Sequence, residues 1–126
     1  MSDIAEHAEQ ASEHVRQLAR ALAVGPDPTV DIADLDALVD VASLYATIGS
    51  LSMLLYRLAA VTGSLHQHVA GLDGHVESDD ATLDITVVLA GACAGLEAAG
   101  ALLHDAARHL DDSHQATARI RPTIHT

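Results

Sequence analysis

The hydrophobic positions of this chain recur at helical intervals in three segments, which clusters of Gly, Pro and Asp separate. In the first segment the apolar side chains follow alternating steps of four and three residues, so they form one narrow stripe on a helix. Gly25 and Pro26 come directly after it, and both are typical of a helix end. The pattern predicts a first helix over about residues 2–24.

A leucine series defines the second segment. Its members recur every seven residues, and a second series follows each by four: Leu44, Leu51, Leu58, Leu65 and Leu72, then Ile48, Leu55, Thr62 and Val69. Such spacing places both series on one stripe, the a/d pattern of helix–helix packing. We expect one long helix over about residues 31–72, closed by the Gly-rich turn that follows.

A matching pattern predicts a third helix. Two series again recur every seven residues: Leu89, Leu96, Leu103 and Leu110, with Ile85, Ala92, Ala99 and Ala106. Leucine alternating with alanine suits two closely approaching antiparallel helices. Because Ser78, Asp79 and Asp80 are favoured N-cap residues, we expect this helix over about residues 79–115.

The predicted fold is therefore all-α. A short N-terminal helix packs on a long antiparallel helical hairpin, and residues 1–126 form a single domain whose last part, 119–126, is irregular. The two long helices are unusually apolar, since Arg57 is the only formal charge in residues 41–72 and Glu97 the only one in 85–104. Helices that are apolar on all sides are usually buried on several of them, which favours a bundle.

The helix lengths predict where a second molecule packs. The first helix is about half as long as the others, so it leaves the half of the hairpin near the turn uncovered. That half is too apolar to face water, and the simplest solution is a two-fold homodimer with a four-helix core. The predicted interface residues are Leu51, Met53, Leu54, Leu55, Leu58, Val61, Ile85, Val88, Leu89 and Leu96.

Arg57 and Glu97 are candidates for a buried ion pair. If the hairpin turns near Glu77, the two residues lie almost level with each other, within one chain or between chains. Such a pair fixes the register of helices more than it adds stability. The alternative is that each side chain reaches solvent by itself.

The chain is strongly acidic. It contains 18 Asp and Glu, six Arg and no Lys, which gives a formal net charge of -12. This charge argues against direct binding to nucleic acid or to an anionic membrane. It suits a protein partner with a basic surface, and the acidic clusters in residues 31–40 and 73–84 also allow a protein that mimics nucleic-acid charge. Nine His would erase most of the charge at mildly acidic pH, which allows a pH-responsive bundle.

Candidate chemistry is sparse. His66, His68 and His75 near the predicted turn are weak metal ligands, because a His-x-His pair on a helix points in different directions, so we expect no metal or cofactor. Cys93, the single cysteine, lies among Ala and Gly as a small core residue would. No nucleophile or phosphate-binding motif is present, so we expect no enzymatic activity.

Localisation follows from the same residues. One cysteine allows no internal disulfide, and the acidic start MSDIAEHAEQ lacks the basic residues and apolar run of a signal peptide. Residues 85–103 have the length of a membrane span, but their flanks are acidic and Arg57 interrupts the companion helix. We therefore expect a cytoplasmic protein and disfavour a membrane hairpin. The leading hypothesis is a self-associating helical adaptor or structural component.

Overall fold

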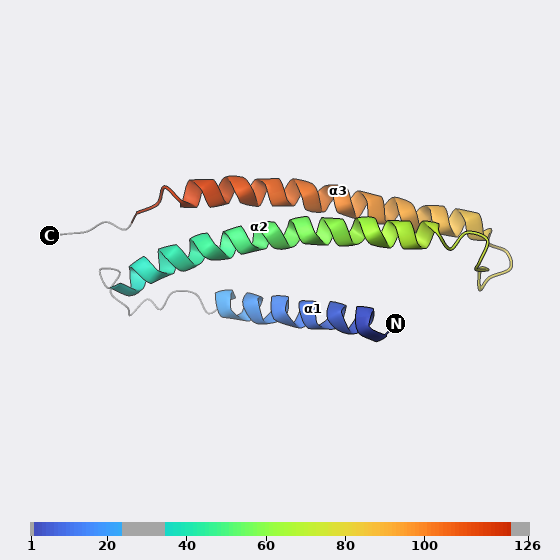
Figure 1. Cartoon of the computed structure of the whole chain (residues 1–126), viewed down its shortest axis with the longest axis horizontal. Helices are drawn as coiled ribbons and strands as arrows, with labels where there is room; N and C mark the ends of the chain where they lie inside the picture. Colours follow the sequence, from blue (N-terminus) through green and yellow to red (C-terminus); the bar gives the residue numbers. More distant parts are fainter. Residues whose placement is uncertain (1, 24–34, 122–126) are drawn as a thin grey trace.

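The computed structural model describes residues 2–23 and 35–121, which contain three helices and no strand. The helices are α1 (Ser2–Ala23), α2 (Leu35–Ala70) and α3 (Ile85–Thr117). Figure 1 shows α2 and α3 side by side along most of their length, joined by the turn that follows Ala70. The all-α class and the long antiparallel hairpin with its short N-terminal helix are confirmed.

Local hydrogen bonds explain where the helices end. At the end of α2 the Gly71 amide donates to the carbonyl of Gln67 at 3.0 Å, and Gly74 has a φ of 83°, which favours glycine. The predicted end at residue 72 is therefore close to the observed one. The predicted start of this helix near residue 31, the preceding Pro-rich loop and residues 122–126 lie outside the described part of the chain.

The predicted start of α3 is wrong by six residues. Its N-cap is Asp84, whose Oδ1 accepts a hydrogen bond from the amide of Thr86 at 2.9 Å. Asp80 instead accepts bonds from the amide and hydroxyl of Thr82, at 2.9 and 2.7 Å. These bonds hold the pKa of Asp80 below its ordinary value. Asp side chains close local turns as readily as they cap helices, so the first Asp cluster forms part of the turn.

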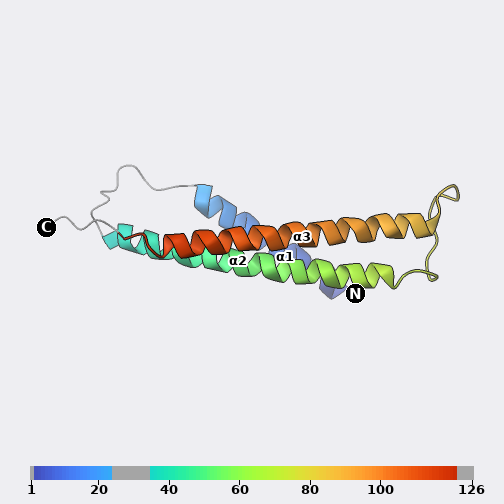
Figure 2. The same ribbon diagram turned by 90° about the horizontal axis from the view of Figure 1, so that it is seen from above.

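The short helix α1 lies alongside the hairpin and does not pack tightly on it. Figure 2 shows its axis crossing those of α2 and α3 at an angle, and no Cα atom of α1 comes within 8 Å of a Cα atom of either helix. The apolar stripe of α1 therefore stays in contact with solvent: Ile4 is 70% exposed, Val15 47% and Leu22 51%.

Candidate functional site

Small and polar residues form the contact line between α2 and α3, which we call the seam. Its most buried members are Ser52, Ala59 and Ala107, with exposed fractions of 2%, 7% and 0%. Small side chains let the two helix backbones approach closely. At Gly100 a Cβ atom would lie 2.9 Å from Oγ1 of Thr62, so the glycine is needed for this approach.

A hydrogen-bonded cluster crosses the seam. The Ser52 hydroxyl donates to Oδ1 of Asp111 and also lies 3.1 Å from the carbonyl oxygen of Ala107, while the Tyr56 hydroxyl donates to Oδ2 of Asp111 at 3.0 Å. The two hydroxyls, Ser52 first, hold the pKa of Asp111 below its ordinary value. The same carboxylate raises the pKa of Tyr56. Because the Ser52 hydroxyl is buried, this cluster fixes the register of the helices and offers no accessible nucleophile.

An aromatic contact continues the seam away from the turn. The ring of Tyr45 stacks on that of His114 with centroids 4.0 Å apart, and Tyr56 meets His104 edge to face at 5.5 Å. The His114 ring occupies the space beside Gly49, where a Cβ atom would lie 2.8 Å from its Nε2.

The seam lies one residue away from the leucine series that the sequence suggested. The α2 residues that meet α3 include Tyr45, Ser52, Ala59 and His66, each of which follows a leucine of the series. Three of the leucines themselves remain open to solvent, since Leu44 is 50% exposed, Leu58 37% and Leu65 41%, and Leu51 is half-buried. On α2 the leucine series therefore does not form the contact with α3, whereas Thr62 of the second series lies against Gly100. Two small-residue rows can approach more closely than a leucine row would allow, and they satisfy the Asp111 carboxylate at the same time.

The displaced leucines belong to a continuous apolar surface. On each helix, the residue before a seam position is rotated from it by about 100°. Since α2 and α3 are antiparallel, this rotation brings the two rows to the same side of the hairpin. We call this surface the leucine face; it consists of Leu44, Leu51, Leu58, Leu65, Val88, Ala92, Ala99, Leu102 and Ala106. Its most exposed leucine is Leu102, at 69%.

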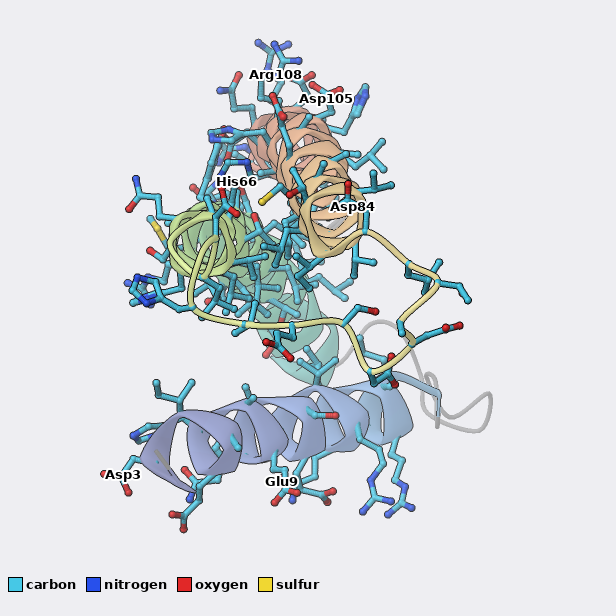
Figure 3. All side chains as sticks on the ribbon, turned by 90° about the vertical axis from the view of Figure 1, so that its right-hand side faces the viewer. Asp3, Glu9, His66, Asp84, Asp105 and Arg108 are labelled. Carbon is cyan, nitrogen blue, oxygen red and sulfur yellow. The ribbon has the colours of Figure 1, made fainter. Side chains whose placement is uncertain are left out.

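The opposite side of the hairpin carries the charges. Residues that follow seam positions include Arg57, Glu97 and Arg108, and all three are exposed. Figure 3 shows Arg108 and Asp105 pointing away from α1, on the outer side of α3, where their side chains pair with each other. We call this surface the charged face. The hairpin is thus amphipathic as a unit.

The predicted site residues fall into different places. Of the ten predicted interface residues none is buried: Met53, Leu58, Val61 and Val88 are exposed, and the other six are half-buried. Arg57 and Glu97 form no ion pair with each other in the single chain that the structure describes, so pairing between chains stays a prediction. Met53 lies next to Ser52 on the side of the charged face, away from the leucine face.

The histidines near the turn do not converge. Within residues 2–23 and 35–121, no group of three or more His, Cys, Asp or Glu side chains could hold a metal ion. His66 lies between α2 and α3 (Figure 3), where its carbonyl oxygen is 3.9 Å from Sγ of Cys93. Beside it is a groove of about 340 Å³ over the small residues Gly63 and Gly100, with Glu97 and His104 also in its wall.

The cluster of Ser52, Tyr56 and Asp111 was not predicted from the sequence. A signal was present in the sequence, because the residues after each leucine form their own seven-residue series of Tyr45, Ser52, Ala59 and His66. A comparable seven-residue series, Cys93, Gly100, Ala107 and His114, lies on α3, and its first three members are small. Two such series can pair closely, but their pairing partners depend on the hairpin register.

Two helices, over Val41–Ala70 and Ile85–Thr117, are long and apolar enough to cross a membrane by length and composition. The register of the hairpin places the apolar parts of the two helices at different heights along the common axis. Ser52 is level with Asp111 and His66 with Cys93, so the apolar first half of α2 lies opposite the charged residues 104–115. A bilayer that enclosed both helices would also enclose those charges, which is costly.

The fold and these surfaces define an all-α protein with a two-sided helical hairpin and no accessible reactive cluster in the described residues. No protein-family model, no curated protein and no solved structure matches the chain.

Proposed function

We propose that this chain is a non-enzymatic helical adaptor or structural component, which self-associates through its hairpin and binds a protein partner within a larger assembly. One observation carries the proposal: within residues 3–22 and 41–121 only two apolar side chains, Ala59 and Ala107, are buried, while fifteen large hydrophobic residues stay exposed. Two helices of this length need further apolar cover, which a second molecule can provide.

The accessible surface supports the same proposal. The chain exposes 9943 Å², whereas a compact monomer of its mass, 13.1 kDa, exposes about 6,400 Å². Both the slender hairpin and the loosely placed α1 contribute to the excess. Self-association lowers the exposed area per chain toward the value of a compact globular protein, and a homodimer is the simplest closed oligomer.

The acidic exterior favours a partner with a basic surface. With a net charge of -12, the chain attracts cationic proteins and repels phosphates. The same charge leaves a nucleic-acid mimic as the second candidate, but two of the acids near the turn, Asp80 and Asp84, already serve local hydrogen bonds. We place the protein in the cytoplasm, in line with its single free cysteine.

The first test measures self-association directly. Light scattering or analytical ultracentrifugation of the full chain, at protomer concentrations from about 1 to 100 µM, should show a dimer or a larger closed oligomer. A well-folded monomer over the whole range would contradict the proposal.

The second test identifies the partner class. In a native pull-down with mass spectrometry, an adaptor retains a partner at fixed stoichiometry through washes of moderate salt. A mimic instead loses its partner in moderate salt and is displaced by added DNA. The two outcomes separate the leading function from the alternative.

A further inference from the structure

We infer that the leucine face is the surface on which a second copy of this chain packs, hairpin against hairpin. The inference rests on the proposed self-association and adds the surface and its occupant. The predicted interface was drawn around the turn-proximal half of the hairpin and included Met53, which lies toward the charged face. The leucine face instead combines one row from each helix, over residues 44–65 of α2 and 88–106 of α3.

Charge selects this face for a self-contact. Two copies bring together a formal charge of -24, twice the -12 of each chain, so their acidic surfaces repel each other. The rows of the leucine face contain no Asp, Glu, Arg or Lys between Leu44 and Ala106. Two such faces can meet with no charge desolvated, whereas the charged face would bury Arg57, Glu97 and Arg108. A two-fold contact requires a self-complementary surface, and this face is uncharged on both sides.

The size of the face is sufficient for a stable contact. Its rows, over residues 44–65 of α2 and 88–106 of α3, are each about 30 Å long and about 10 Å wide. The resulting footprint of about 600 Å² on each copy, about 1,200 Å² for two copies, lies at the lower end of the range of specific stable interfaces. Leucines on the α2 row and alanines on the α3 row supply large and small side chains that can interdigitate.

The competing cover is α1 of the same chain, which Figure 3 shows below the hairpin, on the side away from Arg108. This helix has 22 residues, about 33 Å, and the width of one helix, so it can cover one of the two rows of the face. No Cα atom of α1 lies within 8 Å of a Cα atom of α2 or α3. A second hairpin, which has two adjacent helices, is wide enough to cover both rows.

The experiment compares charge insertions on the two sides of the full chain. Leu58→Glu and Leu102→Glu each place a carboxylate on the leucine face, one on each helix. The matched controls are Met53→Glu and Ala101→Glu, which place the same charge at exposed positions on the opposite side. Val15→Glu tests the stripe of α1. The dissociation constant is measured by sedimentation, and helicity by circular dichroism.

We expect the leucine-face variants to weaken dimerisation by roughly 30-fold or more, the loss typical of a central interface residue, and the controls to change it less than about threefold. Leu58→Ala, which adds no charge, should weaken it in the same direction and keeps the test decisive if Leu58→Glu fails to fold. If the wild type is monomeric, the proposed self-association is overturned as well. If the wild type associates but only the Met53 or Val15 variant dissociates it, self-association stands and the assignment of the leucine face is overturned.

Discussion

Replacing Ser52 by Ala tests whether the buried hydroxyl holds the hairpin together. The change removes the hydrogen bond to Asp111, and such a bond contributes about 1 to 1.5 kcal/mol when the acceptor keeps another donor and water access. Alanine is a better helix former than serine by about 0.5 kcal/mol. The free energy of unfolding should therefore fall by about 0.5 to 1 kcal/mol.

Ser50 provides the matched control, since it lies two residues away on the same helix and is exposed. Ser50→Ala gains the helix propensity without losing a buried bond, so it should be more stable than the wild type by about 0.5 kcal/mol. Urea unfolding followed by circular dichroism at one protomer concentration measures both variants, because association makes the stability depend on concentration. Equal stability of the two variants would refute the role of the Ser52 hydroxyl.

Three further predictions concern the seam and the turn. A Cβ at Gly49 would lie 2.8 Å from the Nε2 of His114, whereas nothing lies within 4 Å of a Cβ at Gly63. Gly63→Ala should therefore raise the free energy of unfolding by about 1 kcal/mol. The free energy of unfolding of the Gly49→Ala variant should be about 1 to 2 kcal/mol lower than that of the Gly63→Ala variant, because the added Cβ meets the imidazole. Asp84→Ala removes the N-cap of α3 and should lower the free energy of unfolding by about 1 kcal/mol in the same urea assay. The hydrogen bond between Tyr56 and Asp111 should depend on pH at both ends of the scale. The pKa of Asp111 is lowered from 3.8, so the stability that its carboxylate contributes is present above pH 3.8 and is lost as the pH falls through the lower pKa of the folded state. The pKa of Tyr56 is raised from 10.0, so the stability that its hydroxyl contributes is present below pH 10.0 and is lost as the pH rises through the higher pKa of the folded state. The stability difference between the wild type and Tyr56→Phe should thus be largest between these limits, and a difference that does not change with pH would contradict the bond.

Much of the fold could be predicted because helices leave a local periodic record. Apolar steps of three and four residues, with Gly and Pro after them, located α1 and the ends of α2 and α3 within about two residues. The start of α3 could not be predicted as closely from the sequence. Ser78, Asp79, Asp80 and Asp84 can all accept a backbone N–H, and the choice among them depends on how the turn returns the chain to α2.

The periodicity of the sequence does not decide which of two neighbouring rows of α2 contacts α3, and the candidate site depends on this choice. On α2 the leucine row and the row of Tyr45, Ser52 and Ala59 are neighbours on the same cylinder with the same period. Hydrophobicity identifies the leucine row as a surface for helix packing, but it does not show whether α3 or another helix packs there; α3 contacts the smaller row. The seam uses the smaller row because Asp111 finds two hydroxyl donors there and because Ala59 and Ala107 allow close approach.

The sequence by itself determined three helices, a hairpin, an acidic exterior and an excess of apolar surface, because each of these follows from residue type and local spacing. Only the tertiary structure decided which row of α2 meets α3. That decision left Leu44, Leu58 and Leu65 exposed, on the same side of the hairpin as the alanine row of α3. The physical reason is that pairing and register depend on contacts between residues more than 25 positions apart, which no local pattern records.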